Sequence, residues 1–507
     1  MTYTRPSIVL PQESCAAFLR HAVVEGADRP ALVFQDRIIS YGTLARWVEA
    51  TKQRLTGAGF GGGSRIGISL PTTPVHVVWV LAVLDLGAIV VPIYDSAPAA
   101  ELRVKCLAAS VDALVVDAGS SDRRRGELAD LPRPLPVLPA EEEPESQFAT
   151  AAPLVPQPDD LAVMPFSSGT TGEPKLILLS HRNVLAARLM FAQATRLHAG
   201  AVLVHFLPLS HVYGWMALTA ALGVGAKVVL HARYDFERLV ADVERHRATA
   251  VFAVSQTIID LERAGAATLA KWKSLSWVNT GSAPLAPAIM SAVAARYGFP
   301  VTTGYGLTEA APVTHTPVER ADLMDVECVG YAAADTVLRL IDPDDPARPL
   351  PQGGAGELVV AGPQVSLGYR HADGFLDRSS WLVDGGFRTG DLVEFDSLVR
   401  VRIVGRIKNI IKYKGYSIAP AELEALLAGH PAVLDCAVVG RADAEAGEIP
   451  TAFVVARHGP PPSADDVIAY VRERVAPQRR IRDVVFVDEI PRSSAGKVLA
   501  RALLEQV

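Results

Sequence analysis

The sequence predicts an α/β protein whose sheets are largely parallel and covered by helices. The first indication is that apolar runs of strand length alternate with segments of helical periodicity through most of the chain. The second is size, because 507 residues, half of them hydrophobic, can bury a large core. A chain of this length suggests two to four structural units rather than one domain.

The alternation of strands and helices is clearest in the N-terminal part of the chain. The expected strands are residues 65–70, 88–93, 113–116, 202–206, 227–230, 250–254 and 276–280. The expected helices are residues 41–55, 99–109, 239–247 and 286–297. This order favours parallel strands joined by crossover helices.

Residues 75–94 form the most apolar stretch of the chain. They include His76, Asp85, Gly87 and Pro92, which make a poor membrane span. We therefore expect a buried helix that ends near Gly87, followed by a buried strand at 88–93.

Residues 120–158 interrupt the alternation with three consecutive arginines at 123–125, many prolines and three glutamates at 141–143. This composition predicts a solvated connection between two subdomains, with the arginines on an exposed face.

Beyond residue 338 the expected elements become shorter. Residues 357–361, 386–389 and 392–395 are glycine-flanked and suggest a smaller β-rich unit. The last hundred residues return to an α/β pattern. There the expected helices are 419–427, entered through Pro420, and 464–475, with Ser463 as its N-cap. The expected strands are 433–440 and 451–456.

Charge and cysteine content exclude several classes of protein. The net charge of −6 argues against general binding to nucleic acid or anionic membranes. The four cysteines lie far apart without a CxxC pair, which disfavours disulfide frameworks and zinc sites: Cys15, Cys106, Cys328 and Cys436. Reduced thiols, and an N-terminus without an apolar signal segment, favour a cytoplasmic protein.

A Ser/Thr/Gly-rich loop, residues 167–175 (SSGTTGEPK), lies between expected strands at 161–166 and 176–179. Its glycines allow close approach to a ligand, its amides and hydroxyls can bind an anion, and Lys175 adds a point charge for phosphate. Taken alone, the same composition also fits a flexible surface turn. It is not a Walker A loop, because no Gly-Lys-Ser/Thr follows.

This string resembles the signature motif of the adenylate-forming superfamily, which includes acyl- and aryl-CoA synthetases, firefly-type luciferases and peptide-synthetase adenylation domains. Four further strings resemble its motifs in the same order: 304–309 (GYGLTE), 387–391 (FRTGD), 405–416 (GRIKNIIKYKGY) and 491–497 (PRSSAGK). The resemblance implies two α/β subdomains and a small β-barrel-like subdomain within residues 1–405. It further implies a mobile α+β domain over 406–507 and the cofactors ATP, Mg²⁺ and coenzyme A.

The resemblance assigns a role to each residue of an adenylation site. Glu309 would hold Mg²⁺, Thr308 would contact the α-phosphate, and Lys497 would stabilise charge between the acyl carboxylate and that phosphate. Tyr305 would stack on adenine, Asp391 would bind ribose, and Arg406 would bind ribose or phosphate. Singly, Glu309 also fits a helix N-terminus, Tyr305 a core aromatic and Asp391 a turn. The implied nucleotide and CoA site comprises Ser167, Ser168, Gly169, Thr170, Thr171, Gly172, Lys175, Gly281, Ser282, Ala283, Pro284, Gly304, Tyr305, Gly306, Thr308, Asp391, Ile403, Arg406, Lys412 and Gly415.

Residues 208–215 (PLSHVYGW) resemble the acyl-pocket motif of CoA ligases. His211 would lie beside the reacting carboxylate or gate its tunnel; it could equally be satisfied within a loop. The expected pocket wall is Trp215, Val254, Ser255, Gly281 and Gly304, which suits an apolar or aromatic acid. Amino-acid-activating members of the family usually place an aspartate near this segment, and the absence of a Phe-Asp start here favours an acid without an α-amino group.

The same resemblance places the interdomain hinge at Lys408 and implies that Lys412, Lys414 and Gly415 lie on the segment that faces the thiol tunnel. A solvated hairpin is the alternative for Lys412 and Lys414. The second half-reaction would then transfer the acyl group to CoA and release AMP.

The sequence departs from the family pattern at three places: Leu176 where glycine is usual, the pair Ser255-Gln256 in place of a proline-rich pair, and Asn409 in place of a commonly acidic residue. Leu176 either packs as the first residue of a strand or restricts the loop. Besides an acyl-CoA synthetase, two alternatives remain open, an enzyme of one half-reaction and one that loads a carrier protein. A non-catalytic binding relative or a P-loop kinase is disfavoured. Monomer and homodimer both remain open.

Overall fold

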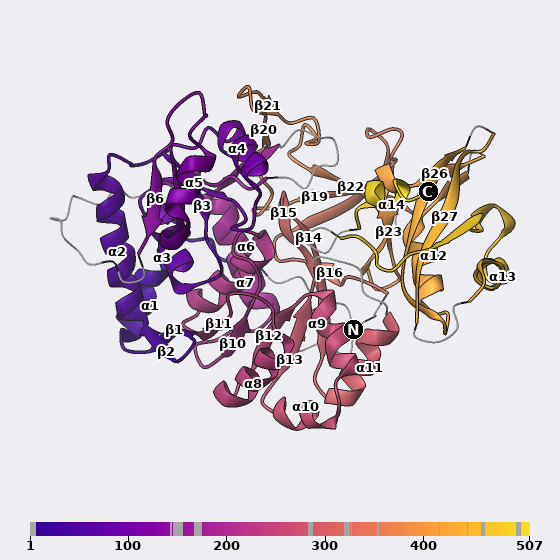
Figure 1. The fold of residues 1–507 in the computed structure, drawn as a ribbon, viewed down its shortest axis with the longest axis horizontal. Helices are drawn as coiled ribbons and strands as arrows, with labels where there is room; N and C mark the ends of the chain where they lie inside the picture. Colours follow the sequence, from indigo (N-terminus) through magenta and orange to yellow (C-terminus); the bar gives the residue numbers. More distant parts are fainter. Residues whose placement is uncertain are drawn as a thin grey trace.

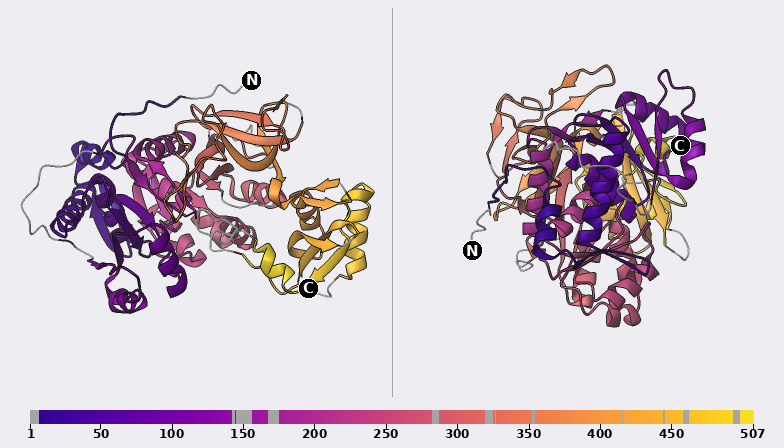
Figure 2. Two further views of the ribbon diagram at one scale, coloured as in Figure 1. Left: turned by 90° about the horizontal axis from the view of Figure 1, so that it is seen from above. Right: turned by 90° about the vertical axis from the view of Figure 1, so that its left-hand side faces the viewer.

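In the computed structural model, the described residues are 7–141, 144, 156–166, 175–281, 287–318, 325, 327–351, 354–414, 416–443, 445–457, 462–492 and 498–507. They form a large α/β body with a smaller C-terminal unit at one end, as Figure 1 and the left view of Figure 2 show. The predicted fold class is confirmed. The domain boundary at residues 405 and 406 stays a prediction.

The first sheet of the body has the strand order β6-β5-β3-β4-β7-β9 and is parallel except for β9. Its strands are β3 (Arg65–Ser69), β4 (Ile89–Pro92), β5 (Ala113–Asp117), β6 (Val137–Ala140), β7 (Leu161–Val163) and β9 (Leu179–Ser180). Helices α2 (Tyr41–Gly57), α3 (Pro74–Asp85) and α4 (Ala99–Ala108) belong to this part of the chain. Helix α3 is buried along almost its whole length, so the expected buried helix and strand at 75–94 are confirmed.

The second sheet has nine strands in the order β16-β15-β14-β13-β12-β10-β11-β1-β2, with parallel pairing from β14 to β1 and antiparallel pairing at both ends. The strands are β1 (Pro30–Phe34), β2 (Arg37–Ser40), β10 (Val202–His205), β11 (Lys227–Leu230), β12 (Ala250–Ala253), β13 (Trp277–Thr280), β14 (Val301–Leu307), β15 (Ala310–His315) and β16 (Tyr331–Ala332). The helices of this part are α6 (His181–Ala194), α7 (Val212–Gly223), α8 (Phe236–His246), α9 (Ser255–Arg263) and α11 (Pro287–Tyr297).

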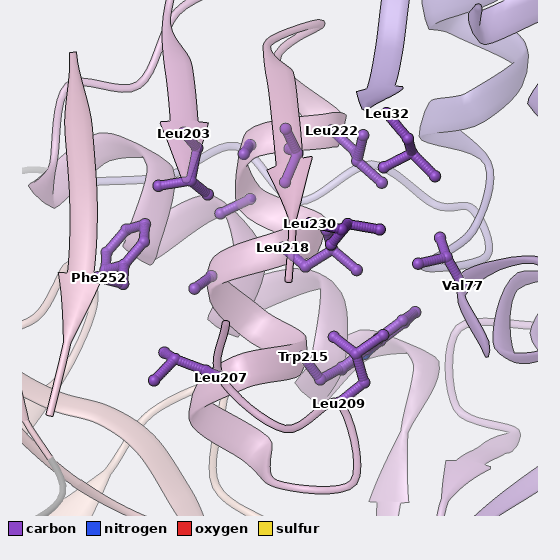
Figure 3. Close-up of a cluster of buried hydrophobic side chains, with 14 of the residues drawn as sticks. Leu32, Val77, Leu203, Leu207, Leu209, Trp215, Leu218, Leu222, Leu230 and Phe252 are labelled. Atoms are coloured by element: carbon purple, nitrogen blue, oxygen red, sulfur yellow. The ribbon is translucent and has the colours of Figure 1, made fainter. Parts of the chain in front are cut away.

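One continuous apolar core joins these two sheets. Figure 3 shows part of it, where Leu218 of α7 lies beside Leu230 of the second sheet, and Leu222 of α7 and Leu203 of the second sheet belong to the same cluster. Val77, from helix α3 of the first sheet, belongs to the same cluster. Burial on this scale fixes α7, and therefore the residues at its N-terminus, relative to both sheets.

The smaller β-rich unit is a five-stranded antiparallel sheet of order β18-β17-β19-β22-β23. Its strands are β17 (Val337–Ile341), β18 (Pro349–Leu350), β19 (Gly356–Ala361), β22 (Phe387–Phe395) and β23 (Val401–Arg406). The two expected segments at 386–389 and 392–395 are one strand, so that division was wrong. Gly390, with a positive φ of 70°, lies where the pattern seemed to break.

The C-terminal unit has its own sheet and its own apolar core. Its elements are β24 (Ile411–Tyr413), β25 (Tyr416–Ile418), α12 (Pro420–Ala428), β26 (Val433–Asp443), β27 (Gly447–Ala456), α13 (Ala464–Arg472), β28 (Asp483–Phe486) and α14 (Ala500–Leu504). Pro420 begins α12, and Ser463 caps α13 in a reciprocal pair with Asp466, as the sequence predicted.

The expected solvated connection at 120–158 was partly wrong, because it contains helix α5 (Ser121–Glu127) and strand β6. Arg124 is only 3% exposed. Its guanidinium donates to the carbonyls of Ala97 and Asp95 and pairs with Glu127 at 2.7 Å. These partners compensate the cost of burying its charge.

All four cysteines are unpaired thiols, in agreement with the expected reduced state. Within the ranges described above, no helix combines the length and apolar character that a membrane crossing requires.

Candidate active site

Of the predicted phosphate-binding loop, residues 167–175, the structure describes only the last residue, Lys175. Ser167, Ser168, Gly169, Thr170, Thr171 and Gly172 lie outside the described residues. An isolated antiparallel bridge between Phe166 and Leu176 closes the loop at its base. Lys175, the last residue of the motif, is described and lies directly before strand β8 (Leu176–Ile177).

The expected single strand at 176–179 is two short strands in different sheets. β8 pairs with β20 (Tyr369–Arg370), which pairs in turn with β21 (Leu376–Asp377). β9 joins the first sheet beside β7. Leu176 is fully buried as the first residue of β8 and belongs to an apolar cluster. Its packing matches the first of the two alternatives for this departure from the family pattern.

Tyr305, Asp391 and Arg406 meet at one corner of the site. Asp391 in β22 faces Arg406 at the end of β23, and the arginine Nε lies 2.7 Å from Asp391 Oδ1. The Tyr305 hydroxyl, from β14, donates to Asp391 Oδ2. Asp391 is only 2% exposed. Burial, reinforced by the Asp391 carboxylate, raises the pKa of Tyr305 well above its usual range, so this hydroxyl remains a donor.

Thr308 and Glu309 lie in the turn between β14 and β15, both half-buried. This position rules out the alternative that Glu309 is a helix N-terminal carboxylate. The Tyr369 hydroxyl donates to Glu309 Oε1 at 2.8 Å, and the Ser366 amide donates to the Glu309 carbonyl at 2.8 Å. Among the described residues, the Glu309 carboxylate receives one side-chain hydrogen bond, at Oε1, so its other oxygen keeps acceptor capacity. Carboxylate oxygen is the type of ligand that Mg²⁺ uses in proteins, so Glu309 fits the implied metal.

Lys175 lies beside the same tyrosine. Its Nζ is 5.3 Å from the centre of the Tyr369 ring and 3.2 Å from Asp377 Oδ2. Hydrogen bonds from Ser379, with smaller contributions from His371 and Lys175, hold the pKa of Asp377 far below its usual range. The structure therefore brings the phosphate-loop lysine and the proposed metal carboxylate to one tyrosine.

Sequence reasoning missed Tyr369 and Asp377. Asp377 lies 202 residues from Lys175, and no local pattern links them. The pairing of β20 with β8 is what brings them together.

His211 is the N-cap residue of α7, where its Nδ1 accepts the Tyr213 amide at 3.2 Å. Beyond it lies a largely apolar hollow that is open at one end. Its walls come from α3, β4, α6 and α7, and they include His211, Trp215 and Thr308. Trp215 is 7% exposed, and its indole nitrogen has no hydrogen-bond partner among the described residues.

Val254, Ser255, Gly281 and Gly304 are not part of the lining of this hollow. Gly281 and Gly304 lie close to each other and to Tyr213 of α7, since a Cβ on Gly281 would be 3.6 Å from the Gly304 carbonyl and 3.7 Å from the Tyr213 ring. Val254 and Ser255 begin helix α9. Their role as an acyl-pocket wall stays a prediction.

Gly304 has a clear steric requirement, since a Cβ there would lie 2.9 Å from the Thr314 carbonyl. Gly306 lies on the same strand, and Ile403 pairs with Val393 across β22 and β23. Ser282, Ala283, Pro284, Gly415 and Lys497 lie outside the described residues.

The expected hinge residue, Lys408, lies in a short 3₁₀ turn (Ile407–Asn409) directly after Arg406. Burial and the nearby Arg406 charge lower the pKa of Lys408, while Asp391 and Glu309 act against them. Lys412 and Lys414 lie on the hairpin of β24 and β25, where the Lys412 amide donates to Glu448 at 2.7 Å. A hairpin was the alternative for this segment.

Comparison with known proteins identifies the family. A family model described as "AMP-binding enzyme" matches residues 19–370, and one described as "AMP-binding enzyme C-terminal domain" matches residues 422–497. The chain belongs to the AMP-binding enzyme family. It is thus an adenylate-forming enzyme, as the motif resemblance predicted.

Two curated relatives are plant members of this family. The chain is 34% identical to 4-coumarate–CoA ligase-like 9 of Oryza sativa subsp. japonica, over 95% of this chain and 90% of that protein. It is 30% identical to 4-coumarate–CoA ligase-like 1 of Arabidopsis thaliana, over 99% and 96%.

Two solved structures share the fold over nearly the whole chain. ATP-bound MatB from Rhodopseudomonas palustris has a TM-score of 0.89 at 26% identity, covering 97% of this chain and 98% of that one. The amide bond synthetase McbA from Marinactinospora thermotolerans has a TM-score of 0.85 at 26% identity, covering 97% and 99%.

Proposed function

We propose that this enzyme activates an apolar or aromatic carboxylic acid with ATP as an acyl-adenylate and then transfers the acyl group to the thiol of CoA. The products are acyl-CoA, AMP and pyrophosphate. The observation that supports this most directly is the convergence of Lys175, Glu309 and the Asp391–Arg406 pair, which come from four separate motifs. Lys175 and Arg406 supply positive charge for the phosphates, and the Glu309 carboxylate supplies negative charge for the metal.

In the first half-reaction the carboxylate oxygen attacks the α-phosphorus, and the bond to pyrophosphate breaks. Lys175 neutralises the departing pyrophosphate, and the Thr308 hydroxyl donates to the α-phosphate. Asp391 and Arg406 hold the ribose, which keeps the α-phosphorus in line with the attacking oxygen. Mg²⁺, when bound at Glu309, offsets the phosphate charge. By family resemblance, Lys497 bridges the acyl carboxylate and the α-phosphate.

The acid's carboxylate would lie near His211 and Thr308, which border the same hollow. The remaining lining is mainly aliphatic, with the indole of Trp215. Burial of apolar surface in such a lining favours an apolar acid. The names of the plant relatives support a CoA ligase. Lys408, in the 3₁₀ turn directly after Arg406, is the hinge of this proposal.

The identity of the acceptor is the second part of the proposal. The similarity to an amide bond synthetase makes an amine a further acceptor to test, beside CoA and a carrier-protein phosphopantetheine. In each case the nucleophile attacks the acyl carbon and AMP leaves.

A panel of carboxylic acids tests both parts. We expect acid-dependent exchange of pyrophosphate into ATP with apolar or aromatic acids, and AMP release that rises when CoA is added. Lys497→Ala is the matched inactive control. Binding of ATP without exchange for any acid would contradict adenylation. Exchange that is unaffected by CoA but followed by turnover with an amine or a carrier protein would contradict only the acceptor.

A further inference from the structure

Tyr369 stands between the two charged groups proposed to receive the phosphates and the metal. Its hydroxyl donates to Glu309 Oε1 at 2.8 Å. Its ring lies 5.3 Å from the Lys175 ammonium, within the range of a cation–π contact. Strand β20, which carries it, pairs with β8, the strand that begins directly after the phosphate-binding loop. Tyr369 therefore contacts both the Glu309 carboxylate and the Lys175 ammonium.

The surrounding structure holds this tyrosine in place. The Trp381 ring packs edge-on against it with a centroid separation of 5.1 Å. The Trp381 indole donates to the Ser366 carbonyl at 3.0 Å, and the Ser366 amide donates to the Glu309 carbonyl at 2.8 Å. Glu309 is thus fixed through its main chain by Ser366 and through its side chain by Tyr369.

We propose that Tyr369 is a positioning residue of the adenylation site, which orients the Glu309 carboxylate for the metal of MgATP. This inference rests on the proposed function. Groups that hydrogen-bond to a metal ligand fix its orientation, and their loss typically costs about tenfold to 100-fold in metal affinity or activity. The Tyr369 hydroxyl donates to the Glu309 carboxylate, whereas the aromatic ring alone makes the contacts with Lys175 and Trp381.

That division of roles makes Tyr369→Phe a specific variant, because it keeps the ring and removes the hydroxyl. We expect the half-saturating Mg²⁺ concentration for ATP–pyrophosphate exchange to rise about tenfold or more. We expect a matching increase in the Mg²⁺ needed for ATP to raise the melting temperature, which is independent of turnover. Stabilisation by ATP with a chelator present should be unchanged, because the Lys175 contact remains.

The matched control is Tyr234→Phe. Tyr234 is also half-buried, and its hydroxyl donates to a carboxylate, Asp260 Oδ2, at 2.6 Å, while its ring packs against Phe206. It should leave the Mg²⁺ dependence unchanged. An unchanged Mg²⁺ dependence in Tyr369→Phe, or a loss of ATP binding with and without metal alike, would overturn the positioning role. A native chain that binds no MgATP would instead overturn the proposed function.

Discussion

Two carboxylates in the site, Asp391 and Glu309, each accept a hydrogen bond from a tyrosine, yet their surroundings differ. Asp391 is buried, and its two oxygens accept from Tyr305 and Arg406. Glu309 is half-buried, and within the described part of the chain its carboxylate receives one hydrogen bond, at Oε1. A carboxylate has about four acceptor positions. The comparison shows that a hydrogen bond from a tyrosine can accompany two different states of a carboxylate. At Asp391 both oxygens are hydrogen-bonded, whereas Glu309 keeps acceptor positions for a metal.

Glu309→Gln should have the largest effect on activity. Removal of one preorganised charged group at a reacting centre costs roughly 100-fold to 1,000-fold in rate, so exchange of pyrophosphate into ATP should fall by that amount. The melting temperature should change little, because the glutamine amide oxygen can still accept from Tyr369. A much lower melting temperature with near-native exchange activity would instead make Glu309 a structural residue.

Asp391→Asn, unlike Glu309→Gln, should substantially lower the free energy of unfolding. It leaves Arg406 facing a neutral amide, and breaking a fully buried ion pair costs about 3–5 kcal/mol. Because Arg406 is partly exposed, we expect a smaller loss, about 2–3 kcal/mol in the free energy of unfolding. Denaturant unfolding measures this loss. The Mg²⁺ dependence of exchange should remain native. A shift like that expected for Tyr369→Phe would mean that Asp391 and Glu309 do not differ in their effect on metal binding.

Asp377→Asn should have the smallest effect of the three substitutions, and it should strengthen ATP binding. It releases Lys175 from a competing carboxylate and removes a negative charge near the phosphate site. ATP binding should therefore tighten, by about twofold to fivefold, in line with a partly exposed ion pair. Calorimetric titration with ATP measures the change. Asp384→Asn is the control, since Asp384 pairs with Arg339 instead; weaker ATP binding in Asp377→Asn would mean that the pair holds Lys175 in its working position.

Much of the parallel core was predictable from the sequence, because fully buried strands and helices leave long apolar runs. Strand β11 and the helix–strand pair α3 and β4 are examples. The motif resemblance assigned Asp391 and Arg406 to one site, and the structure brings them together in an ion pair that the resemblance did not predict.

Features that depend on distant pairing could not be read from local patterns. Residues 176–179 look like one strand, yet their partners lie at 161–163 and 369–370. Tyr369 and Asp377 carry no local signal, since they act on residues 60 and 202 positions away. Arg124 appeared exposed because a charged triplet says nothing of the carbonyls that one member meets.

The split between β8 and β9 constrains how this loop can vary between related chains. Leu178 lies between the two strands, and its backbone is itself hydrogen-bonded on both sides, donating to Gly368 and accepting from Leu367. An inserted residue between Lys175 and Ser180 would reverse the facing of side chains in one sheet or the other. Changes in loop length should therefore be tolerated only on the N-terminal side of Lys175. Lys175 thus marks the C-terminal limit for insertions and deletions in this loop.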